Sequence, residues 1–122
     1  MKTFLIGLFL IAGTLYTYNA AAQKKPLKAT INVPGAQDEW CKNRIENYMK
    51  REYGVLSVVV NYHRHYVRVQ YIGDRTNIEN IKTAIANLGY DADDVTKNEE
   101  AFEKLPIDHR HKVPTPQEEG GQ

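Results

Sequence analysis

Cysteine is almost absent from this chain of 122 residues, in which Cys41 is the single example. A lone cysteine excludes a disulfide within the chain, so cross-links cannot stabilise the fold. If such a chain is exported, its unpaired thiol can oxidise, pair with a second chain or hold a metal ion. The role of Cys41 is therefore the first question that the sequence raises.

A charge excess of either sign is also missing. The chain has 16 basic and 15 acidic residues, for a formal net charge of +1. Domains that bind nucleic acid usually carry a clear basic excess, so we expect no nucleic-acid partner. The sequence likewise contains no recognisable nucleophile–base pair or phosphate-binding loop. The protein is therefore predicted not to be an enzyme.

Long hydrophobic runs are limited to one, from Phe4 to Leu15. This run is shorter than the roughly 20 residues that a membrane span needs. Lys2 precedes it, and the small residues Ala20, Ala21 and Ala22 follow. This is the pattern of a signal peptide. We therefore predict a leader over residues 1–22, export across the inner membrane to the periplasm, and no stable membrane span after cleavage.

A strand, a loop and a helix are predicted after the leader. Apolar and polar side chains alternate over residues 27–33, as in a half-buried strand. Asp38 is a favourable N-cap residue, and Cys41, Ile45 and Met49 then recur at helical spacing. Cys41 is thus predicted in the first turns of a helix, on its inner face.

The rest of the domain continues the same alternation of elements. Residues 55–62 and 66–72 are predicted strands rich in valine and tyrosine, and a second helix ends at Gly89. Residues 90–96 can form a last short strand. The order βαββαβ predicts an α+β, ferredoxin-like fold, in which two helices cover one face of a four-stranded antiparallel sheet.

Three segments are predicted after the leader. Residues 27–96 form the domain, residues 97–105 a short helical extension, and residues 106–122 a disordered tail that contains prolines and histidines.

Several short motifs within residues 27–95 together resemble a known family. They are Val33-x-Gly35, Cys41 followed by Ile45-Glu46, Gly54-Val55-x-x-Val58-x-Val60, Val67-x-Val69-x-Tyr71, and Ile81-x-x-x-Ile85-x-x-x-Gly89-Tyr90. This pattern resembles the heavy-metal-associated (HMA) domain of copper chaperones, mercury-binding periplasmic proteins and metal-pumping ATPases. The resemblance implies the ferredoxin-like fold and binding of a soft metal ion.

The chain departs from that family in the loop that carries the metal. The family loop reads G-M-x-C-x-x-C and binds ions such as Cu(I) through two thiolates. Here Ala36 stands at the methionine position, Asp38 at the first cysteine position and Cys41 at the second. Binding by two thiolates within one chain is therefore lost.

Other residues can supply the missing ligands. The first two strands of the predicted fold run parallel, so the loop at Asp38 and Cys41 and the hairpin His63-Arg64-His65 lie at the same end of the sheet. Alternate residues of an extended chain point to one side, which would bring His63 and His65 together. Thiolate, carboxylate and imidazole suit Zn²⁺ or Cu²⁺. The candidate ligands are therefore Cys41, His63, His65 and Asp38.

Each of these residues also has a simpler interpretation. Cys41 can be a small core residue, Asp38 only a helix cap, and the hairpin histidines solvated. The remaining two of the four histidines lie in a second tripeptide, His109-Arg110-His111. Whether this tail folds back to complete a site, captures metal weakly or has no fixed role stays open.

The sequence therefore predicts an exported HMA-type protein that binds copper or zinc through an altered site, for transport or buffering. A metal transporter or another envelope protein would be its partner. Two alternatives remain: a metal-free interaction module that keeps the HMA scaffold and docks on an envelope protein, and a homodimer linked or metal-bridged through Cys41.

Overall fold

The computed structural model describes residues 25–113. The predicted leader over residues 1–22 and the end of the predicted tail, residues 114–122, lie outside this described part. Among the described helices, none has the length and apolar character needed to cross a membrane.

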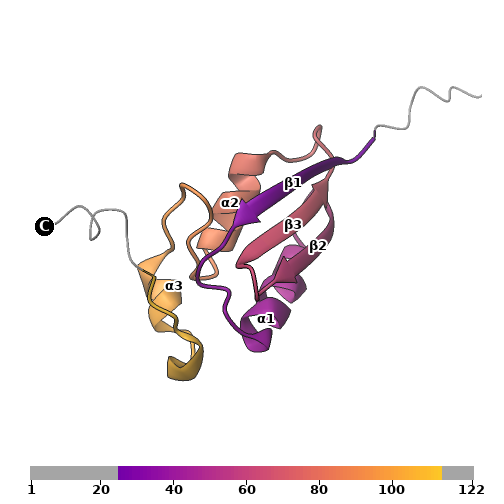
Figure 1. Ribbon diagram of the computed structural model, residues 1–122. Helices are drawn as coiled ribbons and strands as arrows, with labels where there is room; N and C mark the ends of the chain where they lie inside the picture. The colour runs from indigo at the N-terminus through magenta and orange to yellow at the C-terminus, as the bar shows by residue number, and fades with distance from the viewer. Residues whose placement is uncertain (1–24, 114–122) are drawn as a thin grey trace, which may run out of the picture.

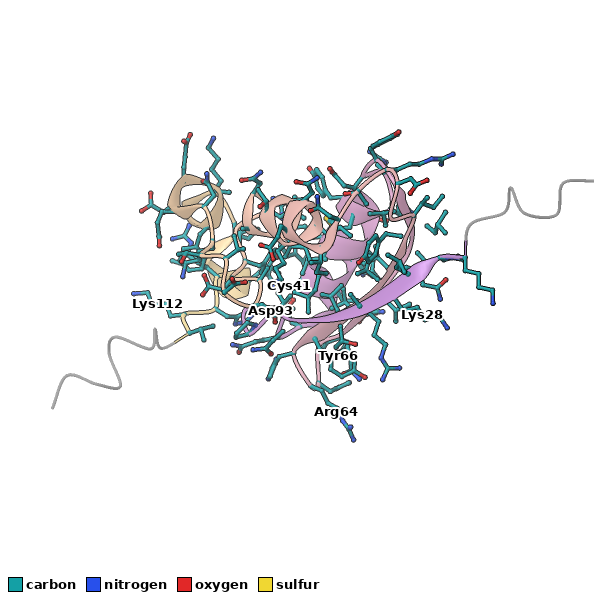
Figure 2. The ribbon with its side chains drawn as sticks, turned by 90° about the horizontal axis from the view of Figure 1, so that it is seen from above. Lys28, Cys41, Arg64, Tyr66, Asp93 and Lys112 are labelled. Carbon is teal, nitrogen blue, oxygen red and sulfur yellow. The ribbon has the colours of Figure 1, made fainter. Side chains whose placement is uncertain are left out.

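A three-stranded antiparallel sheet and two main helices form the domain (Figure 1). The strands are β1 (Leu27–Asn32), β2 (Val55–Asn61) and β3 (Tyr66–Tyr71), in the order β1-β3-β2. Helices α1 (Glu39–Met49) and α2 (Ile78–Ala86) lie on one face of the sheet, as Figure 2 shows. The arrangement is ferredoxin-like, as predicted, with one strand fewer.

The predicted fourth strand, residues 90–96, is wrong. This segment forms a tight turn with one isolated bridge between Ala92 and Val95. Asp93 has a φ of 51°, which an extended strand does not tolerate. It meets the edge of β1 only at Asn32, where its Oδ1 accepts from the Asn32 N–H at 2.7 Å and its own N–H donates to the Asn32 carbonyl at 2.8 Å.

Side chains from the sheet and both helices fill one core. Their relative exposure is 1% or less, and they are Ile31 and Val67 from the sheet, Ile45 and Met49 from α1, and Ile81 and Ile85 from α2. Each helix places its apolar residues at intervals of three or four, so that one face meets the sheet. Cys41 belongs to this core, with no exposed surface.

A side-chain bridge connects α1 to the outer edge of β2. Glu46 Oε1 accepts hydrogen bonds from Lys42 Nζ at 2.5 Å and from the Val60 N–H at 3.1 Å. Lys42 Nζ also donates to the Val60 carbonyl at 3.2 Å. The bridge therefore serves both backbone groups of Val60.

Replacing Glu46 with alanine is expected to lower the free energy of unfolding by about 1 kcal/mol, because the Val60 N–H loses its acceptor. Glu46→Gln keeps a carbonyl oxygen and should cost less. Urea denaturation of the two variants checks this prediction. Equal stability of Glu46→Ala and the parent protein would show that the bridge contributes nothing.

The chain after the domain folds back onto it. We call residues 99–113 the C-terminal strap; it contains α3 (Glu99–Glu103) and the short 3₁₀ helix η2 (Ile107–His109). Helix α3 lies within the predicted extension. Residues 106–113, the described part of the predicted disordered tail, pack beside the β1–α1 loop (Figure 1). Phe102 and Leu105, only 8% and 3% exposed, anchor the strap in the core.

Candidate metal site

The site begins where the β1–α1 loop becomes helix α1. Asp38 has extended backbone angles (φ −144°, ψ 170°) and caps the helix, as predicted, with Oδ1 accepting from the Cys41 N–H at 2.8 Å. This cap places the carboxylate and the Cys41 side chain next to each other. Asp38 is therefore both a cap and a candidate ligand.

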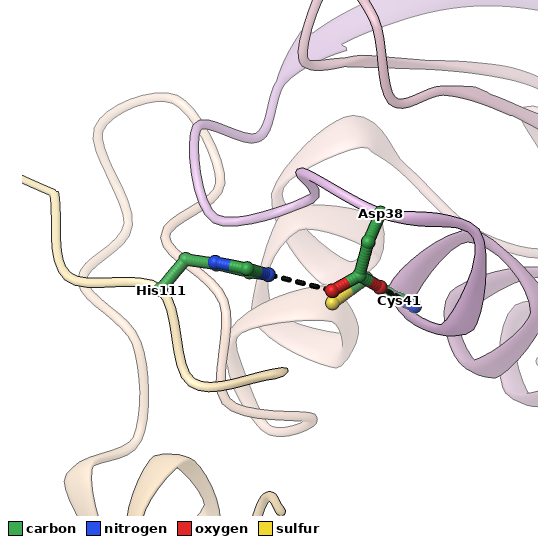
Figure 3. Close-up of side chains that lie close together, drawn as sticks. All are labelled: Asp38, Cys41 and His111. Atoms are coloured by element: carbon green, nitrogen blue, oxygen red, sulfur yellow. Dashed lines mark hydrogen bonds and ion pairs between the residues drawn. The ribbon is translucent and has the colours of Figure 1, made fainter. Parts of the chain in front are cut away.

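The strap brings two imidazoles onto the same carboxylate. Asp38 Oδ2 lies 2.9 Å from His109 Nδ1 and 2.7 Å from His111 Nε2. Figure 3 shows the His111 ring pointing at the carboxylate, with the Cys41 sulfur beside it. The side chains of Asp38, His109 and His111 are partly exposed, between 23% and 29%. Solvent thus reaches the outer side of the cluster.

The Cys41 thiol is the buried member of this cluster. Its Sγ donates to the His109 carbonyl at 3.6 Å. Burial raises the pKa of the Cys41 thiol above the ordinary value of 9.0, and Asp38 acts in the same direction, while Tyr90 opposes them. Cys41 therefore holds its proton near neutral pH, and a metal ion must displace that proton to bind the sulfur.

The pKa of the Asp38 carboxylate is shifted in the opposite direction. Burial alone would raise its pKa, but the hydrogen bonds from His109, the Cys41 N–H and His111 outweigh burial and lower the pKa well below 3.8. The group is ionised at neutral pH. It can therefore act as an oxygen ligand without losing a proton.

A single group of three metal-ligating side chains is found in residues 25–113. It consists of Asp38, Cys41 and His111, whose ligand atoms all lie within 4.8 Å of one another. Carboxylate, thiolate and imidazole are all established ligands of transition metals. Two of the four predicted ligands belong to this group, and the third member comes from the strap.

The hairpin histidines lie outside this group. His65 Nδ1 is 3.2 Å from the Ala36 carbonyl, so hairpin and loop do meet at one end of the sheet. His65 has a φ of 61°, which breaks the extended alternation on which pairing it with His63 depended. The His63 ring instead packs on Tyr62, with ring centroids 4.2 Å apart. Metal binding by His63 and His65 remains a prediction.

Tyr90 is a further residue beside the site. Its hydroxyl is buried and has no hydrogen-bond partner within the described structure. Burial raises the pKa of Tyr90, and the adjacent Cys41 raises it further. In the sequence Tyr90 marks only the end of the family pattern, so its place beside the thiol could not be foreseen.

Residues 30–91 match the heavy-metal-associated domain, and this chain belongs to that family. The copper chaperone CopZ of Staphylococcus epidermidis is 39% identical over 61 residues, which are 50% of this chain and 90% of the chaperone. A copper-exporting P-type ATPase of the same species is 29% identical over 82 residues, 67% of this chain and 10% of the ATPase.

Structural comparison agrees with this assignment. A solved CopZ metallochaperone aligns with a TM-score of 0.52 and 32% identity, covering 54% of this chain and 98% of the other. The family match ends at residue 91, before the strap begins. The strap and its two histidines therefore lie outside the part of the chain that defines the family.

Proposed function

We propose that this protein binds a transition-metal ion, copper in the first instance, and transports or buffers it. The observation that carries the proposal is the position of Cys41 within an HMA domain: the sulfur lies in the first turn of α1, next to an ionised carboxylate. Similarity to copper chaperones supports copper as the ion.

The altered loop, the location and the partner belong to the same proposal. With Asp38 in place of one thiol, the site holds its ion through mixed ligands. The predicted leader over residues 1–22 supports a place in the periplasm. Similarity to part of a copper-exporting ATPase supports a metal transporter as the partner that gives or receives the ion.

Titration of the reduced protein with Cu(I), Cu²⁺ and Zn²⁺, followed by calorimetry, tests the proposal. We expect saturation at one ion per chain for at least one of these ions, and loss of this binding in Cys41→Ser. Thermal unfolding of the metal-free variants verifies that the substitution leaves the fold intact. Unchanged binding by Cys41→Ser would contradict the proposed role of the thiol.

A second candidate function is the metal-free interaction module. It is favoured by Tyr48 and Tyr53, which are 53% and 70% exposed and line a groove of about 420 Å³ between α1 and α2. Absence of binding for all three ions would favour this function. A dimer bridged through Cys41 requires a structural change, because the sulfur is buried and the strap would first have to move.

A further inference from the structure

We propose that the C-terminal strap completes the metal site. In this proposal Asp38, Cys41 and His111 together bind a divalent ion of borderline softness, Zn²⁺ or Cu²⁺, in preference to Cu(I). The inference rests on the proposed function, since it takes Cys41 as a ligand. It adds the third ligand and the class of ion.

The geometry of the strap carries this inference. The candidate ligand atoms of Asp38, Cys41 and His111 already lie within 4.8 Å of one another. Because metal–ligand bonds are about 2.0–2.3 Å long, one ion can contact all three atoms. An ion placed among them needs side-chain adjustment and displacement of the Cys41 proton, with no rearrangement of the backbone. Asp38 and Cys41 are separated from His111 by about 70 residues of sequence, so this meeting depends on the fold of the strap.

The strap is held in place independently of the imidazoles. Within the strap, Arg110 Nη2 donates to the Leu105 carbonyl at 3.0 Å and to the Glu103 carbonyl, which ties residue 110 to the end of α3. The side chains of Phe102 and Leu105 fix the same segment in the core. His111 is therefore presented by an anchored segment, which reduces the entropy lost when a ligand is immobilised.

His109 has a positioning role. Its ring stacks on Trp40, with centroids 4.6 Å apart and planes 9° from parallel. Its Nδ1 donates to Asp38 Oδ2, and its carbonyl accepts from the Cys41 thiol. It is not a member of the ligand group. His109 thus orients Asp38 and the strap beside the sulfur.

The chemistry of the ligands determines the class of ion. Two thiolates would favour Cu(I), but one thiolate with imidazole and carboxylate suits a borderline divalent ion. Binding releases the Cys41 proton to solvent. The proton that His111 Nε2 donates to Asp38 is also lost from that nitrogen, while a proton from solvent is taken up at Nδ1 of the same ring. The thiolate and the Asp38 carboxylate then balance the two positive charges of the ion, and neutral His111 completes the set.

Tyr90 supplies an independent observation that points into the site. Tyr90 is only 2% exposed, and its buried hydroxyl lacks a hydrogen-bond partner within residues 25–113. Its side chain lines a small cavity together with His109 and His111 of the strap, which places it beside the site. Once the sulfur has lost its proton, the hydroxyl can donate to it. Such outer contacts commonly support metal ligands.

The test measures Zn²⁺ affinity by competition with a chromophoric chelator, and Co²⁺ binding by absorption spectroscopy, on the reduced full chain without its predicted leader. The key variant is His111→Gln, which keeps a hydrogen-bond donor for Asp38 but is a poor ligand. The matched control is His63→Gln/His65→Gln, from the identical tripeptide in the hairpin. Trp40 fluorescence, from the only tryptophan in the chain, reports whether the strap stays docked.

We expect His111→Gln to weaken Zn²⁺ binding by about 100-fold or more, at least the loss seen when an outer-shell partner is removed, and the hairpin control to bind as the parent does. A separate variant, His111→Cys, adds a thiol at the same position. It should strengthen the sulfur-to-cobalt charge-transfer absorption of bound Co²⁺, and this gain does not depend on any loss of stability.

The outcomes separate the two proposals. No stoichiometric binding of any ion by the parent protein overturns both of them. Binding that needs Cys41 but is unchanged in His111→Gln, with no added absorption in His111→Cys, overturns the strap ligand and leaves the proposed function standing. Loss of affinity only in the hairpin control would assign the imidazoles to His63 and His65 instead. Tighter binding of Cu(I) than of Zn²⁺ and Cu²⁺ overturns the assigned ion class.

Discussion

Replacing Gly89 with alanine is expected to destabilise the protein strongly and to loosen the strap. Gly89 has a φ of +103°, and a Cβ there would lie 2.9 Å from the Phe102 N and 3.0 Å from its Cα. Such a backbone conformation costs a non-glycine residue about 1–3 kcal/mol, and the contact with backbone atoms adds to this. The clash between the added Cβ and the Phe102 backbone can be relieved only if α3 moves away from the domain.

Gly73→Ala is the matched control. The Cβ at Gly73 would also be close to another atom, Leu27 Cδ1 at 2.8 Å, but this is the tip of a side chain that is 49% exposed. The control should therefore unfold near the parent midpoint in thermal denaturation. Trp40 fluorescence of folded Gly89→Ala reports the loss of stacking on His109. A Gly89→Ala protein as stable as Gly73→Ala would contradict this account of the strap.

Replacing Ile85 with alanine is expected to cost about 2–5 kcal/mol of unfolding free energy, the usual range for removing a large aliphatic side chain from a core. Ile85 has no exposed surface and belongs to the cluster that joins α2 to the sheet and α1. Removing three carbon atoms leaves a cavity that neighbouring side chains only partly fill. Urea denaturation at a fixed temperature measures the loss.

Leu56→Ala is the surface control for this core substitution. Leu56 lies on β2 and is 50% exposed, so its truncation should change stability by roughly 0.5 kcal/mol or less. If both variants lost the same stability, the core would not be where the structure places it.

The elements that could be predicted from sequence are those with strong local signals. Helix α1 has a favourable N-cap at Asp38 and an apolar face at Cys41, Ile45 and Met49. The two valine-rich strands pair as a hairpin, as expected. The meeting of hairpin and loop followed from topology alone, and the contact between His65 and Ala36 agrees with it.

The turn at residues 90–96 and the docking of the strap could not be predicted, because they depend on contacts that local sequence patterns do not contain. The left-handed backbone at Asp93 replaced the expected last strand with a turn. The strap has only two anchoring side chains, Phe102 and Leu105, and so has no periodic apolar pattern to identify it. Its contacts with Asp38 span 71 and 73 positions of sequence. The sequence showed the pair His109 and His111, but it did not show that both residues would contact Asp38.

For the proposed metal site, the complete burial of the Cys41 sulfur has a kinetic consequence. With no exposed surface on Cys41, an ion in solution reaches the sulfur only after a local opening of the structure, and the strap residue His109 covers it directly. The free energy of such an opening can be far smaller than that of global unfolding. Uptake and release would then follow the opening rate of residues 106–113, so exchange speed can be tuned by strap anchors that never touch the ion.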